Sequence, residues 1–378
     1  MRLTWGTFYA LFYLYRCAYS VLGQVIVLRL TSVPDTVQYQ GFTVGQIAAI
    51  AAANEGLDLA MQKNANVLTQ IIAALLGGAT GGNPILINIG FQTLAFLGMV
   101  HLLRGVEVAP RRVLAVLFMT PSFSVWSSIA SKEAIVVLLV CILMRYLVDI
   151  LADRDKLRVR YLIAIVLLYV FKPHFVPAMV FAIVVSKLAS YTRRPATFAL
   201  ACAVASVAPL VLLWHWVGET VMFYTRALYR EPGLSSRGIQ FLQSPEDFFL
   251  KAPEGIALSF MGPNLSELGG GPLHFVSYAE SLAIVAILLA VFIVRAPRIP
   301  IYSLVVGGFT LFWILIATYP LGVFNPGTAI RYRTDYIIVV FVAVVVLMSR
   351  DTYVSWREKR RQPLSLDAGA TGPLQEPA

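Results

Sequence analysis

The sequence EAIVVLLVCILMRYLVDILA at residues 133–152 is an almost continuous apolar run, interrupted only by Glu133, Arg145 and Asp149. Coiled as a helix, a run of about 20 residues is long enough to cross the hydrocarbon core of a bilayer. Similar runs recur from residue 5 to residue 350. The stretch therefore predicts a transmembrane helix, and its repetition predicts a protein that crosses the membrane several times.

The overall composition supports the same class of protein. Hydrophobic residues make up 58% of the chain and charged residues only 13%, which is typical of an integral membrane protein. The formal net charge of +10 lies mainly in short loops, so we interpret it as setting orientation and not as a nucleic-acid surface. The cysteines lie inside apolar stretches without paired spacing, which predicts neither a disulfide framework nor a metal site. They are Cys17, Cys141 and Cys202.

The apolar stretches predict an all-α, polytopic fold with about ten transmembrane helices, in a single domain over residues 1–350. The predicted spans are 5–29, 84–103, 113–130, 133–152, 161–172, 174–192, 197–217, 275–294, 300–319 and 335–350. Residues 161–192 are short for two crossings and long for one, so we expect a broken or re-entrant hairpin that turns at Phe171-Lys172-Pro173-His174. A second re-entrant piece is expected at Leu68–Leu76, before the glycine-rich break at 77–84.

Basic residues predict the orientation of the chain. They gather in the loops near 104–112, 154–160, 193–194 and 295–298 and in the tail after residue 350. By the positive-inside rule, these loops and both termini are cytoplasmic. Two long loops, at about 30–83 and 218–274, are then external. The tail at 351–378 is rich in proline, glycine, alanine and serine towards its end and is predicted to be largely disordered.

Ionisable residues interrupt the apolar runs at three places that this topology brings to the external face. They are Lys132 with Glu133, Lys172 with His174, and Arg331 with Arg333. Ionisable groups at a membrane boundary are costly unless they face protein or water, so their gathering on one side predicts a site. The alternatives are a snorkelling lysine and a hydrogen-bonded histidine at 172 and 174, and ordinary flanking arginines before the last span.

Ser131 and Glu133 also suit the start of a helix. Ser131 can cap the helix that follows, with the Glu133 carboxylate in its first turn, where it complements the helix dipole. Lys132 does not suit that position unless an anion lies nearby, and a bound phosphate would be such an anion. The group at 132–133 therefore predicts either a helix cap or part of a phosphate site.

The second external loop adds further candidates. Arg226 and Arg230 share a helix face by their four-residue spacing, which suits either a wall for an anionic ligand or a solvated helix surface. A general base on this face would have to be one of several carboxylates. The carboxylates are Asp35, Glu55, Asp58, Glu133, Glu219, Glu267 and Asp335. Motifs for zinc proteases, serine hydrolases and P-loop ATPases are absent from the sequence, and no metal or cofactor is predicted.

Several of these segments together resemble bacterial polysaccharide-assembly membrane proteins. The segments are the glycine-rich break and span at 77–103, the Trp-Ser-Ser to Lys-Glu stretch at 121–133, Phe171-Lys172-Pro173-His174, Pro263 with Glu267, and Ile330-Arg331-Tyr332-Arg333. The families they resemble are the EpsG-like and Wzy-type repeat-unit polymerases and, more distantly, membrane glycosyltransferases of the GT-C kind. Relatives tend to have Arg-Pro-His where this chain has Lys172-Pro173-His174, which puts bidentate phosphate binding at residue 172 in doubt.

The resemblance implies a glycosyltransferase or polymerase in the bacterial inner membrane, acting at the periplasmic face on sugars linked to polyprenyl pyrophosphate in exopolysaccharide or O-antigen assembly. It implies that Arg331, Arg333 and Arg226 or Arg230 engage the pyrophosphate. The charges themselves, and not the resemblance, add Lys132, Lys172 and His174 as further contacts. The resemblance places the base at an acidic residue of the first external loop, where Asp35 is the nearest counterpart and Glu55 or Asp58 could replace it. Glu133 is a further candidate from the physical reading of residues 132–133. The partners implied are the lipid-linked oligosaccharide, the bilayer and other polysaccharide-assembly proteins.

Two functions of other classes stay open at this point. A flippase or exporter of a lipid-linked glycan would use the same cations to bind the headgroup without chemistry. A non-catalytic scaffold of an envelope complex would need neither the cations nor the carboxylates. The length of the second external loop favours an enzyme or a receptor surface over a minimal transport cage.

Overall fold

The computed structural model describes residues 4–30, 35–41, 43, 45, 61–152, 154, 156–189, 191–228, 237, 241–270, 272–296 and 299–347. Within these ranges the regular elements are all helices. Five of them are long and apolar enough to cross a membrane, which indicates a helical membrane protein. They are α5 (Pro84–Leu103), α8 (Lys132–Leu151), α11 (Pro195–Leu212), α15 (Pro272–Arg295) and α16 (Ile301–Gly322). A larger number of crossings, about ten, stays a prediction.

The remaining elements are shorter or less apolar and fill the spaces around these five. Near the N-terminus are α1 (Trp5–Leu30), α2 (Asp35–Gln40), α4 (Met61–Thr80), α6 (Val108–Leu117) and α7 (Pro121–Trp126). The middle of the chain holds α9 (Val159–Phe171), η1 (Pro173–Phe175), α10 (Val176–Ala189), α12 (Trp214–Leu228), α13 (Asp247–Leu250), α14 (Ala252–Met261) and η2 (Leu265–Gly270). The last elements are α17 (Pro326–Val342) and η4 (Ala343–Leu347).

Helix α8 forms the centre of the packed core. It lies against α5, α9, α10 and α17, and most of its residues are enclosed by protein. Its start is the one expected from the sequence, because the Ser131 side chain accepts a hydrogen bond from the Ala134 amide at 3.4 Å. Glu133 lies in its first turn. The predicted cap is therefore confirmed. It fixes the start of α8 and thereby the position of the buried Glu133 carboxylate in its first turn.

Helices α5 and α8 pack closely at Gly98. A Cβ atom built on Gly98 would lie 2.7 Å from the Leu138 Cα and 3.2 Å from the Leu138 carbonyl oxygen. Backbone atoms cannot move aside as a flexible side chain can, so only glycine fits this crossing. Small residues at such contacts allow the dispersion forces between helices to act over a longer stretch.

We expect Gly98→Ala to destabilise the protein by about 1 to 3 kcal/mol, because α5 and α8 must separate to admit the methyl group. The matched control is Gly308→Ala in α16, where an added Cβ meets nothing within 4 Å. The thermal unfolding midpoint of the purified protein measures both effects. Equal midpoints for the two variants would contradict the close crossing.

One predicted continuous span and one predicted helix break have different outcomes. The single span predicted over 113–130 is wrong, because α6 ends at Leu117 and α7 starts at Pro121. Thr120 is extended, with φ −61° and ψ 138°, as a residue before proline prefers. The break predicted at Phe171-Lys172-Pro173-His174 is confirmed: α9 ends at Phe171 and a 3₁₀ turn follows at Pro173.

The last helix begins earlier than the sequence suggests. The predicted span starts at residue 335, with Arg331 and Arg333 as its flank, whereas α17 starts at Pro326. The Asn325 side chain caps it by accepting a hydrogen bond from the Thr328 amide at 3.1 Å. Both arginines therefore lie inside the helix, where α17 packs against α8, α14 and α16. This placement decides which of them can reach a ligand.

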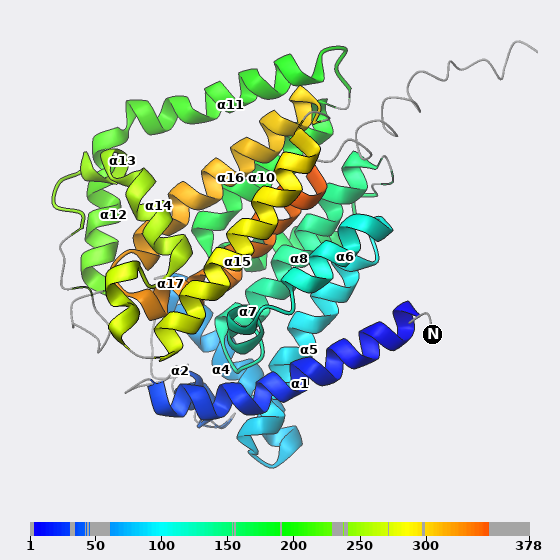
Figure 1. The fold of residues 1–378 in the computed structure, drawn as a ribbon, viewed down its shortest axis with the longest axis vertical. Coiled ribbons are helices and arrows are strands. Elements are labelled where there is room, and N and C mark those ends of the chain that lie inside the picture. The colour runs from blue at the N-terminus through cyan, green and yellow to red at the C-terminus, as the bar shows by residue number, and fades with distance from the viewer. Residues whose placement is uncertain are drawn as a thin grey trace, which may run out of the picture.

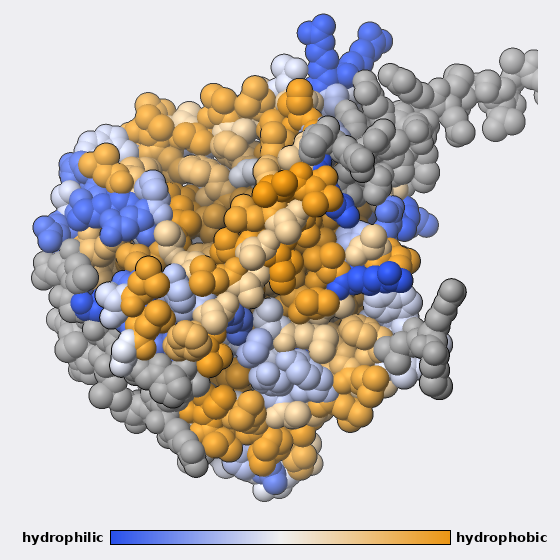
Figure 2. Space-filling model, in the orientation of Figure 1, coloured by the Kyte–Doolittle hydropathy of each residue, from blue (hydrophilic) through white to orange (hydrophobic). Residues whose placement is uncertain are grey.

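The basic loops gather towards one end of the bundle. In Figure 1 the connection between α10 and α11 lies at the upper right and the N-terminus lies lower down at the right edge, while α12, α13 and α14 lie on the left. Figure 2 shows apolar side chains over most of the visible face, along α15 and α16, with polar side chains at its upper, right and left edges. An apolar belt between polar ends is the distribution expected of a protein held in a bilayer.

Candidate functional site

Three segments that lie far apart in the sequence meet at one place. They are the start of α8, the turn between α9 and α10, and the second and third turns of α17. We call the ionisable residues that meet there the charged cluster. Its members are Lys132, Glu133, Lys172, Arg331 and Asp335. The structure thus brings Lys132, Glu133, Lys172 and Arg331 together as predicted, and it shows that the candidate carboxylates Glu133 and Asp335 pair with Arg331 and Lys172.

Arg331 and Glu133 form the outer part of the charged cluster. The Arg331 Nε lies 2.8 Å from Glu133 Oε1, and Arg331 Nη2 lies 3.3 Å from Oε2. This is the bidentate arrangement by which arginine also holds a phosphate. The Glu133 side chain is fully buried, whereas that of Arg331 is 22% exposed. The Arg331 guanidinium also lies 5.8 Å from the centre of the Trp126 ring. Arg331 is therefore the member of the pair that a ligand can reach.

Lys172 and Asp335 form the inner part. The Lys172 Nζ lies 2.8 Å from Asp335 Oδ2, and both side chains are almost completely buried. The same ammonium lies 4.2 Å from the centre of the Tyr332 ring, a cation–π contact. Asp335 Oδ1 has no hydrogen-bond partner among the described residues. Lys172 supplies the balancing charge for Asp335, and a single lysine can do so without the fork geometry of arginine.

Both signs of charge meet in the charged cluster. Among the described residues it holds three cations, Lys132, Lys172 and Arg331, and two carboxylates, Glu133 and Asp335. Lys132 is partly exposed and lies within electrostatic range of Glu133. Cations beside low-dielectric protein attract anions more strongly than they would in open water.

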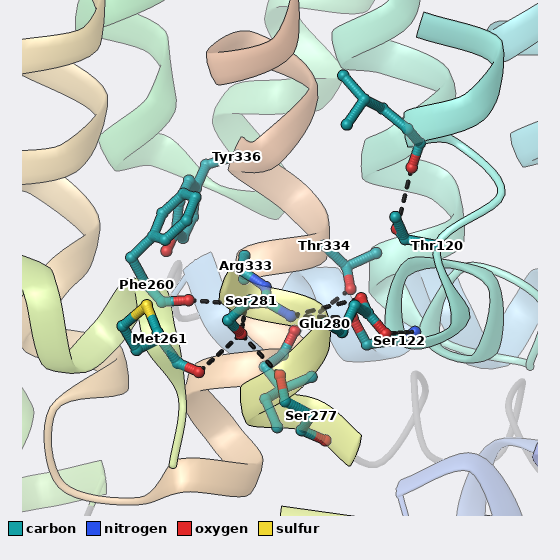
Figure 3. A network of polar contacts seen from close by, with 12 residues as sticks. Thr120, Ser122, Phe260, Met261, Ser277, Glu280, Ser281, Arg333, Thr334 and Tyr336 are labelled. Carbon is teal, nitrogen blue, oxygen red and sulfur yellow. Dashed lines mark hydrogen bonds and ion pairs between the residues drawn. The ribbon is translucent and has the colours of Figure 1, made fainter. Parts of the chain in front are cut away.

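Arg333 belongs to a different set of contacts, shown in Figure 3. Its guanidinium donates to the Phe260 carbonyl at 2.8 Å, to the Ser281 hydroxyl, and to Ser122 Oγ at 3.0 Å. Its Nη2 also lies 3.6 Å from Glu280 Oε1. The Arg333 side chain is 2% exposed. The sequence predicted it as a pyrophosphate contact, whereas the structure encloses it and pairs it with a buried carboxylate.

The other predicted site residues have different places. The His174 ring is half-buried, edge-on to Phe175 and within electrostatic range of Lys172, at the border of the charged cluster. Arg226 is exposed in the last turn of α12. Asp35 begins α2, but its side chain lies outside the described residues. Asp58 and Arg230 lie outside them altogether. The roles predicted for Asp35, Asp58 and Arg230 stay predictions.

Sequence reasoning did not assign two residues that complete these contacts. Glu280 is the sole acidic residue of the predicted span 275–294, and a lone carboxylate inside a span is itself a signal for a buried partner. Ser122 donates its backbone N–H to Glu280 Oε2 at 2.8 Å, and its hydroxyl donates to Oε1. Nothing in the sequence around Ser122 distinguishes it from the serines that follow, so its role needed the fold.

A second arginine–glutamate pair lies between η2 and the end of α16. The Arg237 Nε lies 2.7 Å from Glu267 Oε1 and Nη2 lies 3.1 Å from Oε2. Arg237 Nη1 donates to the Val323 carbonyl at 2.6 Å, and the Asn264 amide donates to Glu267 Oε2 at 2.8 Å. The pair fastens the segment at residue 237 to two other parts of the chain, which is a structural role.

The Arg237–Glu267 pair makes the stability of the folded protein depend on pH. Partial burial by itself raises the pKa of the Glu267 carboxyl, but the hydrogen bonds and charge of Arg237 outweigh it and hold the pKa below its ordinary value. A carboxyl with a depressed pKa in the folded state stabilises the protein at neutral pH, and this contribution is lost as the pH falls through that pKa. We therefore expect the unfolding midpoint to fall as the pH drops below about 4.

Glu267→Gln should lower the free energy of unfolding at neutral pH by about 2 kcal/mol, and with it the unfolding midpoint. The midpoint of this variant should also fall less between neutral and acidic pH than that of the wild type. The measurement is a series of thermal melts across the acidic range. The control is Glu254→Gln, because Glu254 is exposed in the first turn of α14. An unchanged acid decline in Glu267→Gln would show that other carboxyls carry the pH dependence.

The described part of the chain contains no group of three or more histidine, cysteine, aspartate or glutamate side chains placed to hold a metal ion. Comparison of the chain with protein-family models, curated proteins and solved structures finds no match. What the protein does therefore has to be argued from the charged cluster and the helices around it.

Proposed function

We propose that the protein transfers or polymerises sugars carried on polyprenyl pyrophosphate, at the periplasmic face of a bacterial inner membrane. The observation that supports this most directly is the charged cluster, in which the partly exposed Arg331 lies close to Lys132, Lys172 and the buried Glu133. A lipid pyrophosphate requires cations at headgroup depth and an apolar surface for its tail. The apolar helices of the bundle supply the second requirement.

The proposal includes an orientation. The ends of the bundle that carry the basic loops would face the cytoplasm, together with both termini, as the positive-inside rule favours. The charged cluster would then face the periplasm, where lipid-linked sugars are polymerised. The N-terminus and the connection between α10 and α11 both lie on the right of Figure 1, which is consistent with this orientation.

In the proposed reaction the acceptor hydroxyl oxygen attacks the anomeric carbon of the donor sugar. The bond between that carbon and the pyrophosphate oxygen breaks, and pyrophosphate on its lipid leaves with the electron pair. Arg331, Lys132 and Lys172 would stabilise the charge that develops on the leaving group. The hydroxyl proton passes to a carboxylate. Glu133 suits this role once a phosphate has replaced it on Arg331, and Asp35 and Asp58 are the other candidates.

The experiment compares cells that carry the wild-type gene, no gene, Arg331→Met or Glu133→Gln, with polyprenyl-linked material sized by mass spectrometry. We expect Glu133→Gln to slow chain growth by about 100-fold or more, the contribution typical of a general base. Single repeat units should then accumulate at the outer face. The control is Arg104→Met at the end of α5, where Arg104 lies 5.6 Å from the Tyr9 ring and outside the charged cluster.

Folding is checked separately, because Glu133 is buried. Size-exclusion profiles and melting of the purified variants must match those of the control before the chain lengths are compared. Full-length polymer from folded Glu133→Gln and Arg331→Met would overturn the proposal. Repeat units trapped at the inner face would also overturn it, and would favour a flippase that uses the same cations without chemistry.

A further inference from the structure

Helix α1 carries a fully enclosed positive charge that no carboxylate balances in the described part of the chain. Arg16 has 0% exposure. Its Nη2 donates to Ser127 Oγ at 2.7 Å, whereas Nε and Nη1 have no hydrogen-bond partner among the described residues. The guanidinium lies 5.6 Å from the centre of the Phe123 ring. Every other buried arginine or lysine described above has a carboxylate within 4.0 Å, so Arg16 is the exception.

The register of α1 against α5 shows what faces Arg16. The two helices run antiparallel, since Asn88 Nδ2 donates to the Ser20 carbonyl at 3.4 Å and the rings of Phe12 and Phe96 lie 5.7 Å apart. One helical turn from each of these contacts, Arg16 stands level with Gln92. Gln92 is fully buried, and both atoms of its side-chain amide lack a partner among the described residues.

The connection between α7 and α8 also packs against Arg16. Ser127 already binds Arg16, and the adjacent Ser128 is fully buried with a hydroxyl that has no partner among the described residues. The backbones can come close here because Gly23 of α1 faces this connection: a Cβ on it would lie 2.6 Å from Ile129 Cγ2. Unpaired hydrogen-bonding groups therefore lie level with Arg16 on α5 and next to its partner Ser127 in the connection between α7 and α8.

One turn away, the same helices satisfy their polar groups fully. Asn88 donates to Gln24 Oε1 at 2.8 Å and accepts from Gln40 Nε2 and from the Ala130 amide, both at 2.8 Å. The polar groups around Asn88 are therefore hydrogen-bonded, whereas the Gln92 amide and two nitrogens of Arg16, one helical turn away, have no partner among the described residues. Buried polar groups without a protein partner call for water, an ion or another ligand to complete their hydrogen bonds.

A water molecule could satisfy the hydrogen bonds around Arg16, but it would leave the charge uncompensated. An unbalanced charge inside a membrane protein is costly, and a guanidinium stays protonated. The cation–π contact with Phe123 offsets only part of that cost. The groups that remain, from the guanidinium, an amide and a hydroxyl, are mostly donors, and they suit an acceptor that carries a negative charge. The enclosure restricts it to a small one.

We propose that Arg16, Gln92 and Ser128 enclose a small monovalent anion of the halide class between α1, α5 and the connection from α7 to α8. The anion neutralises the guanidinium and fastens α1 to the rest of the bundle. This site is separate from the charged cluster and does not depend on the proposed glycosyl transfer. It stabilises the fold whatever reaction the protein performs.

The test uses the full-length protein purified in gluconate and then given chloride or bromide at constant ionic strength. We expect chloride and bromide to raise the thermal unfolding midpoint in a saturable way, and Arg16→Met to abolish the rise. The matched control is Arg111→Met. Arg111 also lies over an aromatic ring, that of Trp5 at 4.9 Å, but donates to the Val106 carbonyl at 2.7 and 3.0 Å. This variant should keep the halide effect.

A second measurement covers the case in which Arg16→Met does not fold. Bromide that the wild-type protein retains after desalting is counted by X-ray fluorescence, and Gln92→Leu serves as a milder variant. Stoichiometric bromide in the wild type and its loss in Gln92→Leu would support the site. Equal midpoints in gluconate and chloride, with no retained bromide, would overturn it and leave only water at Arg16.

Discussion

Replacing Lys172 with methionine is expected to destabilise the folded protein by about 3 to 5 kcal/mol. The Asp335 side chain has 0% exposure, and Lys172 at 2.8 Å is the cation that balances it. Methionine fills a similar volume but leaves that carboxylate charged and unpaired in a medium that solvates it poorly. The free energy of unfolding from a denaturant titration of the purified protein measures the loss.

The double variant Lys172→Met/Asp335→Leu should recover most of that stability, because it removes both charges and keeps the volume. Asp335→Leu alone should cost less than Lys172→Met, since the remaining lysine still lies within electrostatic range of Glu133. A double-mutant cycle from these values gives the coupling of the pair. A double variant as unstable as Lys172→Met would mean that packing, and not the unpaired charge, causes the loss.

Arg333→Met should have a comparable effect, a loss of about 3 kcal/mol or more. The guanidinium joins α17 to the Phe260 carbonyl, to Ser281 on α15 and to Ser122 on α7, and it balances the buried Glu280. Methionine removes all of these contacts and leaves the carboxylate with hydrogen bonds from Ser122 alone among the described residues. Unfolding titrations in detergent again provide the measurement.

Arg333→Lys should lie between methionine and the wild type, because a point charge cannot reach three elements at once. Adding Glu280→Gln to Arg333→Met should recover stability by removing the unpaired charge. Arg226→Met serves as the control for this series, since Arg226 is exposed on α12. A loss in Arg333→Met no larger than in Arg226→Met would contradict the arrangement in Figure 3.

The sequence predicted the long helices well because length and apolarity are local properties. The spans at 84–103, 133–152, 275–294 and 300–319 correspond closely to α5, α8, α15 and α16. The cap at Ser131 and the break before Pro173 were also predictable, since a serine that precedes an apolar run and a proline act on neighbouring backbone. The break inside 113–130 has a local cause as well, because Pro121 restricts Thr120 to an extended backbone and starts a new helix.

The sequence could bring the charged groups to one region but could not pair them. Lys172 and Asp335 are far apart in the chain, and their contact depends on how α17 is rotated about its axis, which is set by packing against α8 and α16. The same rotation directs Arg331 outward and Arg333 inward, although they are only two residues apart. Residues two apart on a helix point in well-separated directions, so their different environments follow once the helix is known to include them.

The six residues of α7 touch more of the molecule than their number suggests. Arg16 reaches the end of this helix through Ser127, Arg331 lies over Trp126, and Arg333 binds Ser122. One short helix and its C-cap therefore contact cations from α1 and from two positions on α17. A substitution that shortens or distorts α7 would therefore disturb the surroundings of three cations at once, although it changes none of them.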